Sequence, residues 1–500
     1  MNTQSLTQHI NSQATWPLYN LAQTRDIEHQ AQAALPANTL MQRAGLTTAQ
    51  LALAIAPHVQ KIWIACGPGN NGGDGLEAAI HLQAWGKQPI VTWLGKDGEC
   101  PADTQHAWQR AKAAGVCFDE HIPHQFELAI DALLGIGLQR APEGVMAQWL
   151  DALQNTTAPV LCIDIPTGLN ADTGEWLTPS AATHANHARH TLSLLTLKPG
   201  LFTAEGRDAA GQVWFNDLYT DTTQAPTAWL QQTIPTPNER PHNTNKGSFG
   251  DVCIIGGTAG MSGAATLAAV AALHGGAGRV FAGIIDTSAH ATTTAAHPPL
   301  MVRSVDELKL HISTVVCGCG GGDAIHALLP NVLSSSAQLV LDADALNAIA
   351  RDTSLQRLLK NRHTRNKPTV LTPHPLEAAR LLSCQVKDVQ RNRLDAAQQL
   401  ANAFQCVVAL KGSGSIIASA GHTPVVNGSG NARLATAGTG DVLAGLIGAY
   451  MARDKDTFRA TCQAVFAHGN VADAWPQEGA TLDAASVSYT HLTLPTICSV

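Results

Sequence analysis

The sequence is poor in charge. Asp, Glu, Lys and Arg make up 14% of its 500 residues, and their balance leaves a net charge of −7. A net negative chain has no broad electrostatic attraction to nucleic acids or to anionic membranes, so any bound anion must be held by a local site. The ordinary hydrophobic content of 45% excludes a disordered, collagen-like or coiled-coil protein.

Long apolar runs and targeting segments are also missing. The most apolar stretch, 262–285, is interrupted by His274 and Arg279, so it predicts a buried helix followed by a buried strand rather than a membrane span. The first 30 residues are polar and have neither the basic nor the apolar region of a secretory signal. We therefore expect no membrane partner and a cytoplasmic location.

The cysteines do not form a metal or disulfide framework. Eleven are scattered along the chain, and the close pair Cys317 and Cys319 lacks both zinc-site spacing and a second pair of ligands. They are interpreted as structural thiols in a reducing compartment.

Short apolar runs alternate with longer segments of helical period, a pattern typical of parallel βαβ units. Strands are expected at 61–66, 89–95, 128–135, 159–166, 190–198, 251–257, 278–285, 313–319, 337–344, 368–374, 406–412 and 415–421, and helices at 76–85, 102–114 and 439–452. No repeat of fixed period occurs, and the polar, proline-containing stretch 220–245 indicates a linker. The expected organisation is two α/β domains, 1–222 and 246–485, joined by a linker at 223–245. The uncharged residues 486–500 are interpreted as an atypical, artefactual tail that forms neither helix nor strand.

A strand, a glycine-dense turn and a helix are predicted between residues 61 and 85. The spacing Gly67, Gly69, Gly72 matches GxGxxG, but the next strand ends without the acidic residue that ordinary dinucleotide binding needs. Pro68 also removes a backbone donor where pyrophosphate would lie. The ordinary dehydrogenase interpretation is therefore rejected.

Carboxylates follow the same turn and two later strands. Asp74 lies in the turn, and Asp131 and Asp164 lie where the strands at 128–135 and 159–166 end. Because parallel strands bring their carboxyl ends to one edge of a sheet, these groups are expected to converge with Asn70 and Asn71. Such a group suits a bound cation and general acid–base chemistry. The alternative is that the two strand-end acids only cap turns.

Three motifs of this half, GPGNNGGDG (67–75), DALLGIGL (131–138) and IDIPTGLNADTG (163–174), resemble the YjeF N-terminal family, the NAD(P)H-hydrate epimerases, over about residues 41–218. The resemblance implies a Rossmann-like three-layer α/β/α fold and epimerisation of R and S hydrated nicotinamide cofactors. It implies that K⁺ is held by Asn71, Asp131 and Thr167, and that Asp164 binds substrate and handles the proton. The residues implied to hold the dinucleotide are Asn70, Asn71, Gly72, Gly73, Asp74, Gly135, Ile136, Gly137, Leu138, Gln139, Arg140 and Ala141. Thr167 replaces the usual Ser and Ile136 a common Thr.

The second half carries its own candidate site. His374 and Glu377 are expected at the start of a helix, and Lys411 precedes a Gly/Ser turn that suits nucleotide phosphate. Residues 437–441, AGTGD, place glycines at a helix start, where N–H donors stabilise a transferring phosphoryl group. Asp441 in the first turn is placed to accept a proton from an attacking hydroxyl. The alternative is an Asp that only caps the helix.

The motifs KGSFG (246–250), GMSGAA (260–265), DADALN (342–347), LTPHPLE (371–377), LKGSGS (410–415) and AGTGD resemble the ribokinase-like fold, and more narrowly the ADP/ATP-dependent NAD(P)H-hydrate dehydratases. The resemblance implies ADP as co-substrate with Mg²⁺, and Asp441 as the base. The residues implied to contact the hydrated cofactor are Ala264, Gly322, His374 and Asp441. Those implied to contact the nucleotide are Lys411, Gly412, Ser413, Gly414, Ser415 and Gly440. The sequence CGCGGG (317–322) departs from the usual GPGLG, with Cys319 for Pro and Gly321 for Leu.

Together these features predict a bifunctional repair enzyme for hydrated nicotinamide cofactors. Its expected substrates are NADHX, NADPHX and ADP, and we expect a homo-oligomer without nucleic-acid or membrane partners. Two alternatives remain. An ordinary small-molecule kinase would share the GxGD motif, and a non-catalytic N-terminal interaction module would usually have lost its acid. The presence of Asn71, Asp131 and Asp164 argues against the second.

Overall fold

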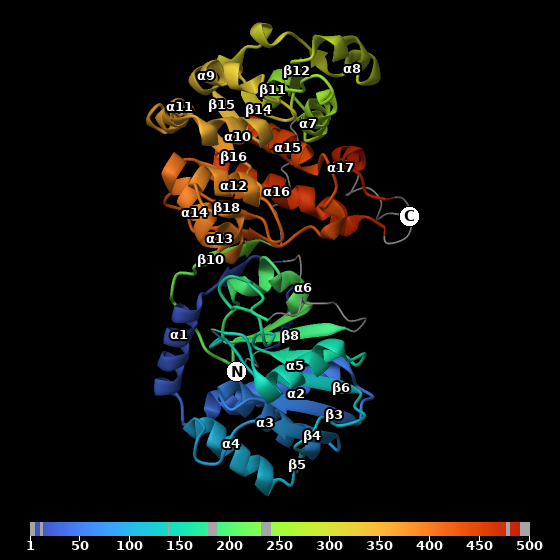
Figure 1. Ribbon diagram of the computed structural model, residues 1–500, viewed down its shortest axis with the longest axis vertical. Helices are drawn as coiled ribbons and strands as arrows, with labels where there is room; N and C mark the ends of the chain where they lie inside the picture. The colour runs from blue at the N-terminus through green and yellow to red at the C-terminus, as the bar shows by residue number, and fades with distance from the viewer. Residues whose placement is uncertain are drawn as a thin grey trace. The chain divides into compact units, whose positions relative to one another are not determined.

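The computed structural model describes residues 6–10, 14–138, 140–178, 188–231, 242–476 and 481–490 (Figure 1). Apart from a few N-terminal residues, a first compact unit ends at Ala228 and a second begins at Trp229. Within the described ranges, no helix combines the length and the apolar character that crossing a membrane requires. Gln139, a predicted site residue, lies outside them, as do 232–241 of the predicted linker and 491–500 of the predicted tail.

The first unit is a mostly parallel sheet with the strand order β1-β9-β8-β7-β6-β3-β4-β5, in which only β1 runs antiparallel to its neighbour. The strands of this sheet are β1 (Gln8–His9), β3 (Lys61–Cys66), β4 (Gln88–Trp93), β5 (Cys117–Phe118), β6 (Leu128–Ala132), β7 (Val160–Ile163), β8 (Arg189–Leu194) and β9 (Gln212–Asn216). A further strand of the unit, β2 (Trp16–Leu18), is not part of this sheet. Its helices are α1 (Leu21–Ala34), α2 (Thr39–Ile55), α3 (Asn70–Ala84), α4 (Ala102–Ala113), α5 (Gly144–Asn155) and α6 (Gly206–Ala210).

Strand β3 shows why this unit has three layers. Its residues alternate between two cores: Ile62 and Ile64 pack on one side with apolar residues of α2 and α3, whereas Trp63 and Ala65 pack on the other with residues of α5. A parallel strand that is buried on both faces needs the continuous apolar run that predicted it. The expected three-layer α/β/α fold is confirmed.

The second unit is a larger mixed sheet with the strand order β13-β12-β11-β14-β15-β16-β17-β18-β19-β10. The strands are β10 (Ala228–Gln231), β11 (Asp251–Gly256), β12 (Arg279–Ile284), β13 (Met301–Val302), β14 (Thr314–Cys317), β15 (Gln338–Leu341), β16 (Thr369–Leu371), β17 (Val407–Leu410), β18 (Ile416–Ala418) and β19 (Val425–Asn427). All pairs are parallel except those that β18 makes with β17 and β19.

Eleven α-helices of this unit are described: α7 (Ser262–His274), α8 (His290–Ala296), α9 (Ile325–Ser335), α10 (Ala343–Arg351), α11 (Thr353–Thr364), α12 (Pro375–Leu382), α13 (Val386–Arg391), α14 (Arg393–Phe404), α15 (Thr439–Arg453), α16 (Thr457–Ala474) and α17 (Ala484–Thr490). Residues of α7, α15 and α16 share one core with the sheet. The predicted buried helix and strand at 262–285 are α7 and β12.

Three elements differ from expectation. Helix α3 begins at Asn70, six residues before the predicted helix, so the glycine-dense segment is helical rather than a turn. Strand β10 lies inside the segment predicted as a linker and pairs with β19. Helix α17 covers 484–490, although no helix was expected from 486 onward.

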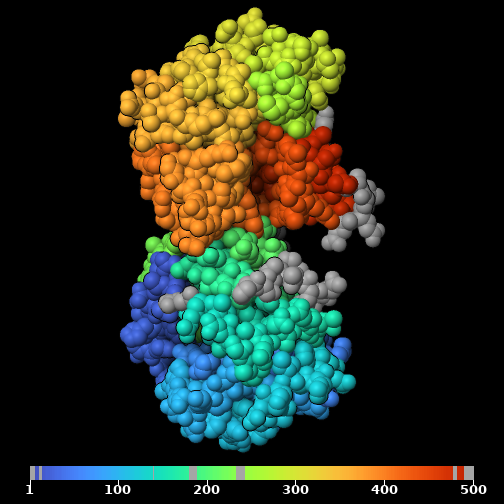
Figure 2. Space-filling model, viewed as in Figure 1, coloured from blue at the N-terminus to red at the C-terminus, as the bar shows by residue number. Residues whose placement is uncertain are grey.

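Helix α17 forms because its apolar side chain has somewhere to pack. Val487 is fully buried in a cluster with Ala271 of α7 and Val442 of α15. The side chain of Asp483 accepts the Ser486 N–H at 2.6 Å, which satisfies a backbone donor of the first turn. In Figure 2 the red C-terminal segment accordingly lies beside the yellow-green segment that contains α7.

Candidate active sites

In the first unit, β3, β6 and β7 are neighbours, and the carboxyl ends of β6 and β7 bring Asp131 and Thr167 together. Asn71 lies beside the segment that follows β6, since a Cβ at Gly135 would lie 3.3 Å from its Oδ1. The Thr167 hydroxyl donates to Oδ1 of Asp131 at 2.7 Å, and the Thr167 N–H donates to Oδ2 at 2.9 Å. Burial raises the pKa of Asp131, against the opposing effect of these hydrogen bonds. Asn71 is buried and its side-chain nitrogen has no hydrogen-bond partner.

Asp164 follows β7 directly and has a left-handed backbone, with φ of 66°. Few residues other than glycine adopt this conformation, so the surroundings must hold it. The Leu194 N–H donates to Oδ1 of Asp164 at 3.1 Å, and the ammonium of Lys198 forms an ion pair with the same oxygen. The Lys198 side chain is fully buried and also donates to the Leu194 carbonyl at 2.7 Å.

A cavity of about 410 Å³ opens beside these groups. Asp164 and Lys198 line it together with Asp74 of α3 and Glu28 of α1. Burial raises the pKa of Asp74 well above its usual value, and the negative charges of Asp164 and Glu28 add to the effect. Burial also raises the pKa of Glu28, again with Asp164 contributing. The cavity therefore offers two carboxyl groups with raised pKa values beside an acid, Asp164, that is paired with the buried Lys198.

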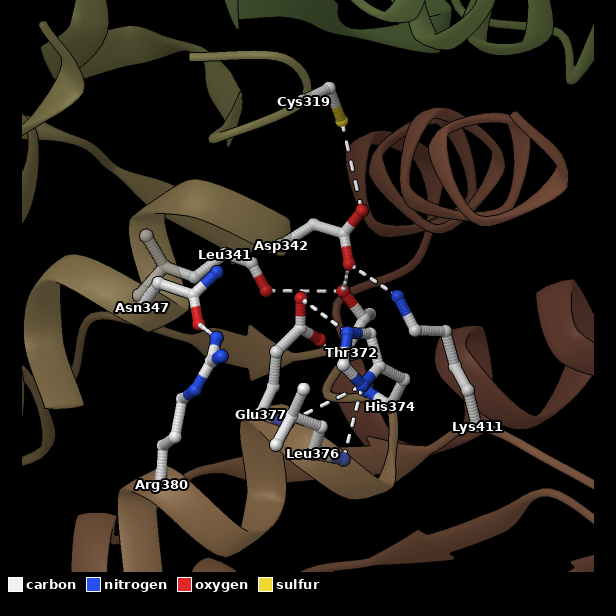
Figure 3. A network of polar contacts seen from close by, with 10 residues as sticks. All are labelled: Cys319, Leu341, Asp342, Asn347, Thr372, His374, Leu376, Glu377, Arg380 and Lys411. Carbon is white, nitrogen blue, oxygen red and sulfur yellow. Dashed lines mark hydrogen bonds and ion pairs between the residues drawn. The ribbon is translucent and has the colours of Figure 1, made fainter. Parts of the chain in front are cut away.

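In the second unit, the centre of the site is the carboxylate of Asp342, which follows β15 and is 2% exposed (Figure 3). Its Oδ1 accepts from the ammonium of Lys411 at 2.6 Å and from the hydroxyl of Thr372 at 2.7 Å. Burial alone would lower the pKa of Lys411, but the charges of Asp342 and Glu377 outweigh it and raise that pKa. Lys411 is thus held protonated in the interior.

Asp441 lies in the first turn of α15, just after Gly438, which is left-handed with φ of 89°. Burial, followed by the negative charge of Asp342, raises the pKa of Asp441 to about 6. Ligand atoms of Asp441, Asp342 and Cys319 lie within 4.8 Å of one another. Burial and the two carboxylates raise the pKa of the Cys319 thiol, so Cys319 is protonated here.

His374 caps α12, because its Nδ1 accepts from the N–H groups of Leu376 at 3.1 Å and Glu377 at 3.4 Å (Figure 3). The Glu377 carboxylate in turn accepts the His374 N–H at 2.8 Å. Burial raises the pKa of Glu377 to about 7, and burial with the nearby Lys411 lowers that of His374. His374 is therefore neutral at pH 7, and its ring is oriented by the helix that it caps.

Two glycine segments border this centre. In the first, Gly318, Gly320 and Gly322 all have positive φ, and the Gly322 N–H donates to Asp344 at 2.8 Å. A second cavity of about 540 Å³ is lined by Gly322 and residues of α9–α11. In the other segment, the Ser415 hydroxyl donates to the Gly412 carbonyl at 3.2 Å and closes the turn that follows β17.

Comparison with known proteins gives two matches along the chain. Residues 37–200 match the family described as YjeF-related protein N-terminus, and residues 252–492 match NAD(P)H-hydrate dehydratase. The bifunctional NAD(P)H-hydrate repair enzyme Nnr of Escherichia coli (strain K12) is 35% identical over 460 residues, which are 87% of this chain and 84% of that protein. This chain belongs to the family of bifunctional NAD(P)H-hydrate repair enzymes.

The relative of the same description from Coxiella burnetii (strain RSA 493 / Nine Mile phase I) is 33% identical and covers 92% of this chain and 95% of its own. Among solved structures, the ADP/ATP-dependent NAD(P)H-hydrate dehydratase from Bacillus subtilis, co-crystallised with ATP and Mg²⁺, is 27% identical. It covers 51% of this chain and 91% of its own, with a TM-score of 0.45.

In this member of the repair-enzyme family, the predicted residues of the first site divide into two groups. Those that line the 410 Å³ cavity are Asn70, Asn71, Asp74, Gly135, Ile136, Gly137, Leu138 and Asp164. Gly72, Gly73, Asp131, Arg140, Ala141 and Thr167 do not line it. Gly72 and Gly73 are buried inside α3, where they pack against the Gly67 carbonyl and the Met41 side chain.

In the second site, the structure brings Asp441, Lys411 and Gly440 together. A Cβ placed at Gly440 would lie 3.4 Å from Nζ of Lys411. His374 is linked through Glu377 to the same group, since Glu377 and Asp342 both act on the charge of Lys411. Ala264 lies near the 317–322 segment, because a Cβ at Gly320 would lie 3.0 Å from its own Cβ. The remaining predicted residues, Ser413 and Gly414, lie in the turn between β17 and β18.

Several residues of these sites had no assigned role from the sequence. Lys198 and Glu28 had not been singled out at all, and the acid of Asp342 had been noted only as the end of a strand. Lys198 ends an apolar run, LSLLTLK, and its burial has no local signal. Only the pairing of Lys411 with the strand-end acid of DADALN could have been anticipated, since both follow parallel strands.

Proposed function

We propose that this chain repairs hydrated nicotinamide cofactors. The first unit interconverts the R and S epimers of NADHX or NADPHX, and the second dehydrates the S epimer to NADH or NADPH at the expense of ADP. The observation that carries the proposal is the pair of separate acid sites, one with Asp164 paired to Lys198 and one with Asp441 beside the Asp342–Lys411 pair. An ordinary kinase would need only the second.

In the first site, Asp164 takes the proton of the ring hydroxyl as the bond between the hydroxyl-bearing carbon and the ring nitrogen opens. It returns the proton to that oxygen once the bond has re-formed on the other face of the carbon, which interconverts the epimers. Its left-handed backbone and the bonds from Leu194 and Lys198 hold the carboxylate at the cavity wall. The substrate dinucleotide lies along Asn70 and the 135–138 segment. Asp74 and Glu28, whose pKa values are raised by burial, face the same space.

In the second site, Asp441 accepts the proton of the ring hydroxyl of the substrate. The oxygen of that hydroxyl attacks the terminal phosphorus of ADP, and AMP leaves. The phosphorylated oxygen then departs as inorganic phosphate, and loss of a proton from the adjacent ring carbon restores the dihydronicotinamide. Lys411 and the N–H groups at the start of α15 stabilise the phosphate charge. A pKa of about 6 leaves Asp441 ionised at pH 7 and still basic enough to take a proton.

Both proposed ions suit the residues present. The carboxylate of Asp131, the hydroxyl of Thr167 and the amide oxygen of Asn71 are oxygen donors of the kind that K⁺ takes, and they would hold it at this edge of the sheet. The carboxylate oxygens of Asp342 and Asp441 are ligands of the kind that Mg²⁺ binds, whereas the thiol of Cys319 is not. When bound, Mg²⁺ would neutralise nucleotide phosphate charge.

Location and assembly stay predictions. All ten cysteines in the described part of the chain are free, which supports a reducing compartment such as the cytoplasm. A homo-oligomer is expected.

The test is recovery of the reduced-nicotinamide absorbance from hydrated NADH. Purified protein is incubated with ADP and either the S epimer or an equal mixture of epimers. Full recovery from the mixture is expected, since the first unit supplies the second. Recovery of only the S half would remove the epimerase part of the proposal. No recovery, together with phosphorylation of another alcohol, would favour a small-molecule kinase.

A further inference from the structure

Two arginines of the second unit are almost completely buried. Arg362 in α11 is 2% exposed and Arg393 in α14 is 1% exposed. Burial lowers the pKa of each guanidinium to about 10, so both remain cations at pH 7. Within the described part of the chain, neither forms an ion pair with a carboxylate. A buried cation without a counter-charge costs free energy, so each position needs a reason.

Arg362 has a structural reason. Its Nε donates to the Thr369 hydroxyl at 2.7 Å, and its other nitrogens donate to the carbonyls of Leu333 at 2.8 Å, Ser336 at 3.1 Å and Pro368 at 3.3 Å. These acceptors lie just before β15 and at the start of β16, at the edge of the sheet opposite the site. Every nitrogen of this guanidinium has a hydrogen-bond partner, and Arg362 links the segments that precede β15 and β16.

Arg393 is placed differently. It is the first residue of α14, and its Nη2 donates to the carbonyls of Leu410 at 3.3 Å and Lys411 at 3.0 Å. Its Nη1 donates to Gln390 at 2.8 Å, and its Nε is buried without a partner. The acceptors lie at the carboxyl end of β17, which is the edge that carries the site.

The turn that follows β17 rests on this guanidinium. A Cβ placed at Gly412 would lie 2.7 Å from Nη2, 2.8 Å from Nη1 and 3.0 Å from Cζ of Arg393. Gly412 also has φ of 140°, so both the space and the backbone favour glycine. The positive charge of Arg393 therefore lies directly against Gly412, the first residue of the 412–415 turn.

The charge balance of this edge adds to the argument. The ammonium of Lys411 is 2.6 Å from the Asp342 carboxylate, so the charge of Lys411 is largely offset before any ligand binds. The charge of Arg393 is not, since no acidic side chain contributes to its pKa. In a buried setting an uncompensated charge attracts an approaching anion more strongly than a paired one.

We propose that Arg393 is a positioning residue for the nucleotide: it fixes the 412–415 turn through the two β17 carbonyls and attracts the phosphates of a nucleoside diphosphate from beneath that turn. This inference rests on the proposed function, in which the same turn binds ADP. Arg393 does not touch the reacting atoms. Its role is to shape the turn and to supply the charge that the paired Lys411 does not.

The test uses the full chain and three variants. Arg393→Met removes the charge and the hydrogen bonds of the guanidinium, and Arg393→Lys keeps the charge. Arg362→Met is the matched control at another buried arginine. Steady-state dehydration gives KM for ADP, KM for S-NADHX and kcat. Calorimetric titration gives the dissociation constants of ADP, AMP and adenosine, and thermal unfolding reports stability. The wild-type chain is measured first, because without ADP-dependent dehydration by the wild type the proposed function itself fails.

For Arg393→Met we expect KM for ADP to rise at least about 10-fold, with kcat at saturating ADP and KM for S-NADHX within about 2-fold of wild type. Weakening should be greatest for ADP, smaller for AMP and absent for adenosine, because the charge acts on phosphates. Arg362→Met should lower the melting temperature without changing these constants. Equal weakening of ADP and adenosine, or an unchanged KM for ADP, would overturn the proposal.

Arg393→Lys keeps the proposal testable if Arg393→Met does not fold. It retains the cation and loses only part of the carbonyl contacts, so KM for ADP should stay within about 3-fold of wild type. A rise as large as that expected for the Met variant would show that charge beneath the turn is not what matters.

Discussion

At the scale of single residues, each proposed site depends on an acid that is constrained by the residues around it. Asp441 has a pKa of about 6 because burial and the neighbouring Asp342 both oppose its charge. Asp164 is instead held by a buried lysine, Lys198, in a backbone conformation that few non-glycine residues adopt. Each acid is thus matched to a task by the residues around it rather than by its own chemistry.

The pH dependence of dehydration should follow the ionisation of Asp441. A raised pKa means that the base is deprotonated only above about pH 6, so kcat should be constant above pH 7 and fall about 10-fold per unit below pH 6. Phosphate release from ADP with S-NADHX between pH 5 and pH 8 measures this. A kcat that stays level down to pH 5 would contradict Asp441 as a base with this pKa.

Replacing Lys198 should damage only the first activity. Lys198→Met leaves the Asp164 carboxylate without its buried cation and without one of the bonds that hold its orientation, so the epimerisation rate should fall at least about 10-fold. The rate of epimer interconversion, followed by chromatography, is the readout. Dehydration of S-NADHX serves as the internal control. Equal loss of both activities would point to general unfolding instead.

Single residues also show where sequence reasoning ended. Asp131, Asp164, Lys411 and Asp441 were predicted at one edge of each sheet, because strand ends are visible in the apolar pattern. Lys198 could not be predicted in the same way. A lysine at the end of an apolar run gives no indication that its ammonium turns inward to an acid 34 positions earlier.

At the scale of elements, α3 shows how packing overrides local propensity. Glycine disfavours helix interiors, so the NNGGDG segment predicts a turn. In the structure this segment is helical. The first turns of α3 pack so closely on the residue after β3 and on the end of β6 that larger side chains would not fit, which explains the glycines. A Cβ at Gly72 would lie 1.9 Å from the Gly67 carbonyl oxygen, and one at Gly75 would lie 2.6 Å from the Ala132 Cβ. The glycines that suggest a phosphate-binding loop in the sequence are therefore explained in part by the close packing of α3.

The packing explanation predicts a large loss of stability when one glycine of this segment is replaced and almost none when another is replaced. Gly72→Ala forces a methyl group against backbone and should destabilise the first unit by about 2–4 kcal/mol. Gly69→Ala should change stability by less than about 0.5 kcal/mol, since no atom lies within 4 Å of its Cβ position and its φ of −96° is ordinary. Urea unfolding of both variants provides the comparison. Similar losses in the two would contradict the packing explanation.

Helix α17 shows the reverse case, in which packing creates an element that the local sequence does not indicate. The uncharged segment after residue 485 has no helical pattern of its own, yet α17 buries Val487 against α7 and α15. An element this short is stabilised by its neighbours rather than by its sequence, so no local pattern could have predicted it.

At the scale of the whole molecule, the order of motifs along the chain predicts two α/β units with one site each. The strand orders show the two α/β units, and one site in each stays a prediction. The pattern could not predict β10, because a four-residue strand in a polar, proline-containing segment has no periodic signal. Each site described here is built from residues of one unit alone. The two proposed activities should therefore be separable by single substitutions.

The most direct test of this central claim is complementation between two inactive-site variants. Asp164→Asn should keep dehydration and lose epimerisation, and Asp441→Asn should do the reverse. Each is incubated with ADP and an equal mixture of R- and S-NADHX, for a time too short for uncatalysed epimerisation, while the reduced-nicotinamide absorbance is followed. We predict recovery of the S half with Asp164→Asn alone, none with Asp441→Asn alone, and full recovery when the two proteins are mixed. If the mixture recovers no more than Asp164→Asn alone, the account of two independent sites in one chain is contradicted.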